Sequence, residues 1–294
     1  MAIEGSRIEL PYVRPALFSN HVESPDGEPM SAAPPVPDMD RTRLVEVAAA
    51  DLPRLASLFD PDYPNLAFVH AVIDGAIPGR AWARFQGDAP VTCLVATTAP
   101  FCMAAGAMSP AFFTEARTLL TGHGEVQLIH PPGADTEAWA QQAGFTAGQR
   151  MHFTHARSGF VAAPPVVPDG YALVRIDAET FSGLESPMAR SIFGTGAHYV
   201  AHAVGFALVK DGQVAADAHG VLGGGLNELG ANTHPDHRRK GLASVALAAV
   251  SHWGNEQGLR SIVTCHADKA PSIALARKLG LTEEFSYPIA KATC

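Results

Sequence analysis

The segment from Leu226 to Val250 constrains the fold more than any other part of the chain. It reads LNELGANTHPDHRRKGLASVALAAV. An apolar strand pattern leads into a polar turn, and a helix pattern with apolar residues every three or four positions follows. The only run of three consecutive bases in the chain, Arg238-Arg239-Lys240, lies at the junction. This order predicts an α/β fold in which a basic turn joins a strand directly to a long helix.

The same junction favours the binding of an anion. Gly241 and Ala243 are small enough for a ligand to approach the backbone, and the free amides and dipole of the first helical turn attract negative charge. The neighbouring guanidinium and ammonium groups add mobile positive charge, so the site suits a pyrophosphate. Neither a Walker loop nor a dinucleotide fingerprint follows any predicted strand. On charge alone, a solvated basic turn is the other interpretation.

Composition limits the partners of the chain. The 294 residues are 47% hydrophobic and 17% charged, with a net charge of −8, which predicts a globular protein and argues against bulk binding to nucleic acid or an anionic membrane. No secretion signal or apolar run of membrane-spanning length is found in the sequence. The four cysteines form no CxxC pair and are predicted to be reduced thiols in a cytoplasmic protein.

Charge and proline divide the chain into two predicted domains. Residues 1–160 contain 10 arginines, no lysine and 17 acids, and include a Pro-rich arm near residues 24–39. Three prolines at 161–169 predict a linker, and residues 170–294 form the second domain. Segments 138–153 and 274–289 align at an offset of 136, each in the order helix, glycine, strand. This similarity indicates a duplicated domain or, alternatively, a chance likeness of two alanine-rich helices.

The remaining patterns predict a mixed sheet with helices. Apolar runs bounded by Gly and Pro predict strands at Phe68–Ile73, Gly79–Phe85 and Val91–Thr98. Ser109 followed by Pro110 predicts the start of a helix. The Gly223-Gly224-Gly225 run is interpreted as a structural turn between strands, because no helix pattern follows it.

The junction resembles a known family. Pro235-x-x-Arg238-x-x-Gly241-x-Ala243 is similar to motif A of the GNAT superfamily of acyl-CoA N-acyltransferases, [QR]xxGx[GA], and lies in the same order of elements. Together with residues 264–281 and Tyr287, it resembles a bacterial GNAT family whose N-terminal half is acyltransferase-like and whose active half is C-terminal. The implied fold class is α/β (an α+β mixed sheet) with two tandem GNAT-like domains, the first of them degenerate and without a cofactor loop.

The resemblance implies acetyl-CoA as co-substrate and no metal. Backbone amides from residue 239 to residue 244 would hold the pyrophosphate of coenzyme A, and the end of the preceding strand would pair with the pantetheine arm. The side chain of Arg238 or Lys240 would reach a phosphate. The implied coenzyme A-binding residues are Ala231, Asn232, Thr233, Arg238, Arg239, Lys240, Gly241, Leu242, Ala243 and Ser244.

Acyl transfer to an amine also needs a proton acceptor. Glu228 is the only acid on the strand that enters the motif, and some GNAT enzymes place a general base there; a surface carboxylate is the alternative. Many GNAT enzymes have a tyrosine that acts as general acid, and this chain has Ala276 at that position. Tyr287 is therefore the candidate general acid; the alternative is that it is a tyrosine of the core. His219 and His266 are further candidates for the acceptor pocket.

The predicted function is therefore transfer of an acetyl group from acetyl-CoA to a primary amine of a small molecule, by direct attack in a ternary complex. The expected partner is that amine. Neither nucleic acid nor a membrane is an expected partner, and a homodimer is left open. Two alternatives remain at this point: a non-catalytic acyl-CoA-binding or sensing protein, and an aminoacyl or peptide acyltransferase with a larger acceptor.

Overall fold

The computed structural model describes residues 43–155, 164–184 and 186–294. The described residues belong to one compact unit, Met39–Cys294, and the fold below is that of this unit. The predicted arm at 24–39 lies outside the described residues, as does part of the predicted linker at 161–169. No helix within the described ranges is long and apolar enough to cross a membrane.

The first half of this unit alternates short strands and helices. Its elements are β1 (Val45–Glu46), the 3₁₀ helix η1 (Ala49–Leu58), α1 (Leu66–Ile73), β2 (Gly79–Gln86), β3 (Ala89–Thr97), β4 (Phe101–Gly106), α2 (Pro110–Leu119), β5 (Glu125–Ile129), α3 (Ala134–Gln142) and β6 (Thr146–Thr154).

The second half ends in the same order, helix and then strand. Its elements are β7 (Ala172–Arg175), α4 (Ala178–Ser182), α5 (Pro187–Phe193), α6 (Gly196–His202), β8 (Ala203–Lys210), β9 (Gln213–Gly223), β10 (Leu226–Thr233), the 3₁₀ turn η2 (Pro235–His237), α7 (Leu242–Glu256), β11 (Arg260–His266), α8 (Ala270–Lys278) and β12 (Glu283–Thr293).

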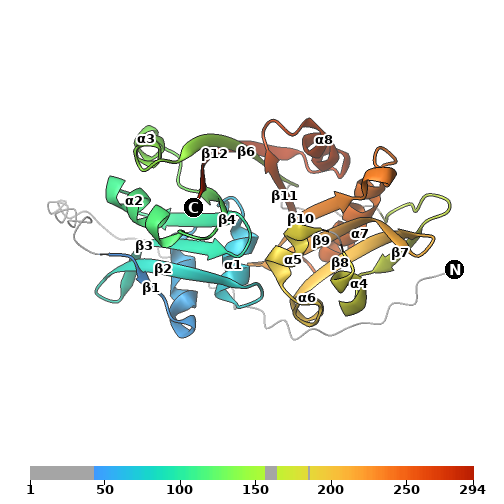
Figure 1. Cartoon of the computed structure of the whole chain (residues 1–294), viewed down its shortest axis with the longest axis horizontal. Coiled ribbons are helices and arrows are strands. Elements are labelled where there is room, and N and C mark those ends of the chain that lie inside the picture. Colours follow the sequence, from blue (N-terminus) through green and yellow to red (C-terminus); the bar gives the residue numbers. More distant parts are fainter. Residues whose placement is uncertain (1–42, 156–163, 185) are drawn as a thin grey trace, which may run out of the picture. The chain divides into compact units, whose positions relative to one another are not determined.

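The strands form one mixed sheet in which the two halves exchange their last strands. The order is β1-β2-β3-β4-β5-β12-β6-β11-β10-β9-β8-β7, so β12 lies between β5 and β6, and β6 lies between β12 and β11 (Figure 1). The two echoing sequence segments are therefore neighbours: β6 and β12 pair antiparallel from Thr154 opposite Glu283 to Thr146 opposite Lys291. The strands β6 and β12 each follow a helix that ends near a glycine with positive φ: Gly144 after α3 and Gly280 after α8.

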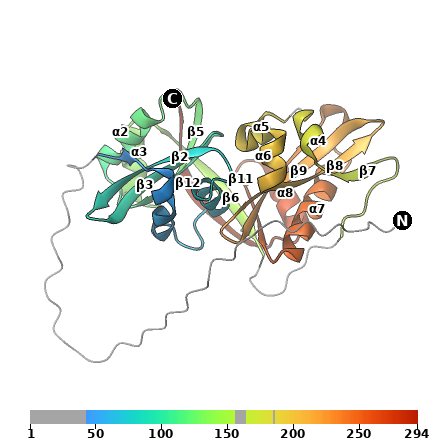
Figure 2. The same ribbon diagram turned by 90° about the horizontal axis from the view of Figure 1, so that it is seen from below.

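Helices cover both faces of the C-terminal strands. Figure 2 shows α4–α6 on one face of β7–β9 and α7–α8 on the other. The α7 face buries residues such as Phe153, Leu229 and Val263 against the helix. The opposite face buries Leu226 and Ile262 with the apolar residues of α1. Side chains alternate between the faces along each strand, so Glu228 projects toward α1 together with Leu226.

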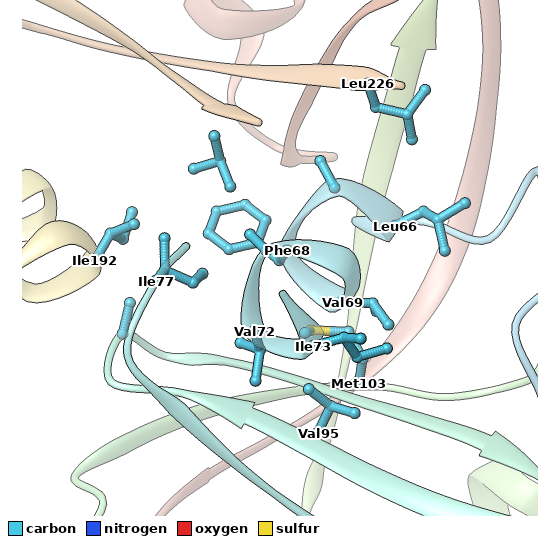
Figure 3. Packing of buried hydrophobic residues seen from close by; sticks show 14 of the residues in the cluster. Leu66, Phe68, Val69, Val72, Ile73, Ile77, Val95, Met103, Ile192 and Leu226 are labelled. Atoms are coloured by element: carbon cyan, nitrogen blue, oxygen red, sulfur yellow. The ribbon is translucent and has the colours of Figure 1, made fainter. Parts of the chain in front are cut away.

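The apolar run at residues 68–73 is a helix, and the strand predicted there is wrong. Every residue of α1 except His70 is buried. Figure 3 shows Val95 and Met103 on one side of this helix, with Ile192 and Leu226 on others. A helix that is covered on all sides has no polar face, so its sequence has no helical period to detect. The β-branched Val and Ile residues of this run are typical of strands, which explains the wrong prediction.

The triple-glycine turn between β9 and β10 lets α1 approach the sheet. A Cβ built on Gly224 would lie 2.3 Å from the His70 ring, whereas one on Gly225 would meet nothing within 4 Å. Both glycines have positive φ, 59° and 76°. The turn is structural, as predicted, because Gly224 packs closely against His70 of α1.

We expect Gly224→Ala to destabilise the protein by about 1–2 kcal/mol more than Gly225→Ala. Both changes impose the same left-handed strain of about 1 kcal/mol, but only the first forces His70 to move. Urea unfolding of the two variants measures the difference. Equal destabilisation would mean that α1 does not depend on this contact.

Candidate active site

The parallel strands β10 and β11 diverge at Glu228. They pair only at Leu226 with Arg260, Asn227 with Ser261 and Glu228 with Ile262. Beyond this point β10 stays paired with β9 up to Thr233, while β11 pairs with β6. Ala231 and Asn232 are exposed. Within the described strands, the last residues of β10 therefore present an open backbone edge toward β11.

An exposed basic loop follows this edge. Arg238 Nε donates a hydrogen bond to the Thr233 carbonyl at 3.4 Å, and Lys240 Nζ donates to the Asp236 carbonyl at 3.3 Å. Arg239 adopts a left-handed conformation with φ 62°. Gly241 caps α7 with φ 77° and offers no side-chain acceptor to the helix amides.

Two of the implied cofactor residues already have structural roles at the start of α7. Leu242, the first residue of α7, is buried in a cluster with Leu208 of β8 and Ala215 of β9. The Ser244 amide donates to the Gly241 carbonyl at 3.1 Å. Arg239, Lys240 and Gly241, by contrast, are exposed.

Glu228 lies in a buried polar network on the α1 face of the sheet. Its Oε1 accepts hydrogen bonds from Asn65 Nδ2 at 2.5 Å and from Thr264 Oγ1 at 2.8 Å. Tyr287 donates to Asn65 Oδ1 at 2.8 Å. The structure thus brings together the two predicted catalytic residues, which are only 4% and 5% exposed, through a residue of the first half.

Arg150 on β6 donates hydrogen bonds to three residues of this network. Its three guanidinium nitrogens donate to Tyr287 Oη at 3.1 Å, Gln127 Oε1 at 2.8 Å and Thr264 Oγ1 at 3.0 Å. The guanidinium also lies over the Phe101 ring, 5.2 Å from its centroid. Because Arg150 is itself buried, this set of contacts fixes the positions of Tyr287 and Thr264.

The network leaves one oxygen of Glu228 without a hydrogen bond. Oε2 is buried and has no partner. Burial raises the pKa of Glu228 to about 7, against the lowering effects of Thr264, Arg150 and Asn65. Burial also raises the pKa of Tyr287 to about 12, with the Arg150 charge opposing it. At neutral pH the Glu228 carboxyl is therefore poised between its two protonation states, the condition for exchanging a proton.

The predicted histidines have other environments. His219 lies beside Asp217, with Nε2 2.9 Å from Oδ2, and its Nδ1 is 3.0 Å from the Tyr199 hydroxyl. His266 is at the end of β11, and burial lowers its pKa. Among the described residues, no group of three or more His, Cys, Asp or Glu is arranged to hold a metal ion.

Sequence reasoning missed Asn65, Arg150, Thr264 and Gln127. Asn65 precedes α1 in a left-handed conformation with φ 59°, which asparagine adopts more readily than most residues. Gln127 and Arg150 are buried polar residues on β5 and β6, and Thr264 is half-buried on β11. Buried polar groups need partners, so polar residues within predicted strands were the available signal.

Solved structures with a similar fold cover most of this chain. A GCN5-related N-acetyltransferase-like protein from Streptococcus suis has 17% sequence identity and a TM-score of 0.63, over 82% of this chain and 99% of that one. A GCN5-related N-acetyltransferase from Sphaerobacter thermophilus has 13% identity and a TM-score of 0.55, covering 85% and 95%.

A third similar structure has the tandem arrangement predicted here. It is a tandem GNAT protein from the clavulanic acid biosynthesis pathway, with 18% identity, a TM-score of 0.54 and coverage of 85% of this chain and 98% of that one. At these identities the likeness shows the fold alone. A comparison with curated proteins gives no match.

The family itself is shown by the sequence. The model of the family described as GNAT acetyltransferase matches residues 57–290, which include Asn65, the Glu228 strand, the basic loop and Tyr287. The mixed α/β sheet and the similar fold of the tandem GNAT protein agree with this match. The chain therefore belongs to the GNAT acetyltransferase family, and it is an acyltransferase.

Proposed function

We propose that this protein transfers an acetyl group from acetyl-CoA to a primary amine of a small molecule, by direct attack in a ternary complex. One observation carries the proposal. Glu228 is the last residue of β10 that pairs with β11, and the open strand edge and basic loop follow it. A carboxyl group thus lies beside the place where, in this proposal, an extended thioester arm would enter the sheet.

The residues of the loop fit coenzyme A. The exposed edge at Ala231–Thr233 has the backbone groups that would pair with a pantetheine arm. The left-handed Arg239 and Gly241 turn the loop so that it meets α7 at the helix N-terminus, where amides and dipole favour a pyrophosphate. Arg238 and Lys240 are exposed, and each donates a hydrogen bond to a backbone carbonyl, at 3.4 and 3.3 Å. When bound, acetyl-CoA supplies an activated acetyl group and a thiol leaving group.

Glu228 would accept the proton of the amine. An alkyl ammonium with a pKa of about 10 is almost fully protonated at neutral pH, so a group that takes its proton raises the fraction of attacking amine. The carboxylate oxygen Oε2 has no competing hydrogen bond. Asn65 and Thr264 bind Oε1 and hold the carboxyl group in one orientation.

Tyr287 has a positioning role in this proposal. Its hydroxyl proton is donated to Asn65, and its pKa is about 12, which makes it a weak acid toward a thiolate. By holding Asn65, the hydroxyl keeps the Nδ2 group directed at Glu228. Protonation of a thiolate by water is adequate because a thiol is a good leaving group.

Buried thiols support direct attack over an acyl-cysteine route. Burial raises the pKa of Cys93 to about 12 and also raises the pKa of Cys265. A thiolate is the nucleophilic form of cysteine, so neither residue is activated. Intact-mass measurement of protein mixed with acetyl-CoA alone should show no acetylated enzyme.

The proposal is tested with purified protein, acetyl-CoA and a panel of small primary amines. Thiol release and the N-acetyl product, followed by mass spectrometry, should appear in equal amounts. Acetyl-CoA binding without product from any amine would instead identify an acyl-CoA-binding protein. Product formed only with an aminoacyl-tRNA or a carrier-bound amine would identify a larger acceptor.

A further inference from the structure

A cavity of about 400 Å³ lies at the amino ends of β10 and β11, within the range of roughly 300–1,000 Å³ that is common for small-molecule sites. Phe59, Pro61, Leu66 and Leu226 line it with apolar surface, and His70 and Arg260 supply its polar side chains. Leu66 and His70 come from α1, so the cavity is on the face of the sheet that carries Glu228.

The position of the cavity along β10 relates it to the reaction site. Leu226 and Arg260 are opposite each other in the sheet, and Glu228 and Ile262 form the pair two residues further on, about 7 Å along the strands. Beyond Glu228 come the open edge and the basic loop. The order along β10 is therefore cavity, Glu228 and then the open edge, so the cavity and the open edge lie on opposite sides of Glu228 along the strand.

The turn that borders the cavity leaves room for a ligand. Gly225 lines the cavity, and a Cβ built on it would meet nothing within 4 Å. Its neighbour Gly224 is packed against His70 instead. The space next to the Cα of Gly225 is consequently not filled by α1.

Arg260 gives the cavity its positive charge. Its side chain is 20% exposed, and its partner Asp62 is 72% exposed at 4.0 Å between Nη1 and Oδ1. A contact at that distance, screened by water, is weak and leaves the guanidinium fork able to bind a carboxylate with two parallel hydrogen bonds. Burial lowers the pKa of His70, so this ring is neutral at pH 7 and does not compete for an anion.

We propose that the acceptor is an α-amino acid with an apolar side chain, whose carboxylate binds Arg260, whose side chain fills the cavity and whose amine is directed toward Glu228. This inference rests on the proposed acetyl transfer for its chemistry. The binding site itself depends only on the cavity, and the two ideas are tested separately.

The first measurement is binding without turnover. N-acetyl-L-phenylalanine, the expected product type, is titrated into the wild-type protein and into Arg260→Gln by calorimetry. We expect binding to the wild-type protein and an affinity about 10–100-fold lower for the variant, the usual effect of losing a hydrogen-bonded charge pair. Arg190→Gln is the control, because it removes the same charge from an exposed position on α5 that does not line the cavity.

The second measurement is turnover with a matched pair of amines. L-phenylalanine and 2-phenylethylamine share a ring and a primary amine, and only the first has a carboxylate. The wild-type enzyme should have a KM at least about tenfold lower for phenylalanine, and Arg260→Gln should remove that preference through KM rather than kcat. Arg190→Gln should retain the preference.

The outcomes separate the two proposals. Arg260-dependent binding of N-acetyl-L-phenylalanine, with no turnover of any amine, supports the site and overturns acetyl transfer to small amines. Turnover of 2-phenylethylamine as efficient as that of phenylalanine overturns the amino-acid acceptor and leaves acetyl transfer standing. Absence of binding to the wild-type protein, or equal binding to Arg260→Gln, also overturns the assignment of the cavity.

Discussion

Replacement of Glu228 by Gln is expected to lower kcat by about 10²–10⁴-fold at pH 7, the usual effect of removing a general base. The amide keeps the size of the side chain and an Oε1 that accepts from Asn65 and Thr264. It removes only the basic oxygen. The affinity for acetyl-CoA should stay within about threefold of the wild-type value, because the basic loop is unchanged.

The pH profile distinguishes a lost base from a lost structural contact. In the wild-type enzyme, kcat/KM should rise with pH through about 7 as Glu228 ionises. Glu228→Gln should lack that inflection and recover part of its rate at high pH, where more of the amine is already neutral. Glu179→Gln, at an exposed position in α4, is the matched control and should follow the wild-type profile. A Glu228→Gln enzyme within about threefold of the wild-type rate would reassign Glu228 to a structural role.

The stability of the same variant provides an independent check of the Glu228 environment. The pKa of this carboxyl is about 7 in the folded protein and near its ordinary value of 4.5 in the unfolded chain. Between these values the folded state keeps a proton that the unfolded state releases, so the Glu228 contribution to the free energy of unfolding falls as pH rises, by roughly 3 kcal/mol in total. The free energy of unfolding of Glu228→Gln minus that of the wild-type protein should therefore be larger at pH 8 than at pH 5. Urea unfolding of both proteins at the two pH values measures this difference.

The sequence was sufficient to predict the elements that have a local signal. The strand predicted before the basic turn is β10, Leu226–Thr233. Ser109 caps α2 by accepting a hydrogen bond from the Phe112 amide at 3.3 Å, as the Ser-Pro pair predicts. The long helix predicted after the basic turn is α7, Leu242–Glu256. In each case, capping residues or periodicity within a few positions determine the structure.

Features that depend on distant contacts could not be predicted. Residue 65 contacts residue 228 only because α1 packs against the second half, and no local pattern gives that pairing. The repeat at 138–153 and 274–289 indicated a duplication, but it did not indicate that β6 and β12 would pair with each other and exchange between the halves. The candidate base was found from its position before the motif, whereas the two residues that bind its Oε1, Asn65 and Thr264, lie on two other segments of the chain.

Replacement of Gly241 by Asp is expected to weaken acetyl-CoA binding by at least about 100-fold. The residue is exposed at the start of α7, and a new carboxylate there would repel a pyrophosphate; two charges 4 Å apart interact by about 4 kcal/mol at the effective dielectric of a protein surface. A Cβ at this position would have only Lys278 Nζ nearby, at 4.0 Å, so the side chain fits without a clash. Calorimetry with acetyl-CoA measures the loss.

Two control variants separate charge from backbone strain and from a general effect of an added carboxylate. Gly241→Asn has the shape of Asp and tolerates the left-handed conformation equally well, so it tests strain at φ 77° without the charge. Gly258→Asp adds the same carboxylate just beyond the other end of α7, at φ 75° and with nothing within 4 Å of its Cβ. Both should bind acetyl-CoA within about tenfold of the wild-type protein, and Gly258→Asp within about twofold, because repulsion requires the charge to be at the loop. If folded Gly241→Asp keeps the wild-type affinity, the pyrophosphate does not bind between Arg239 and Ala243, and the assignment of this loop to coenzyme A is wrong.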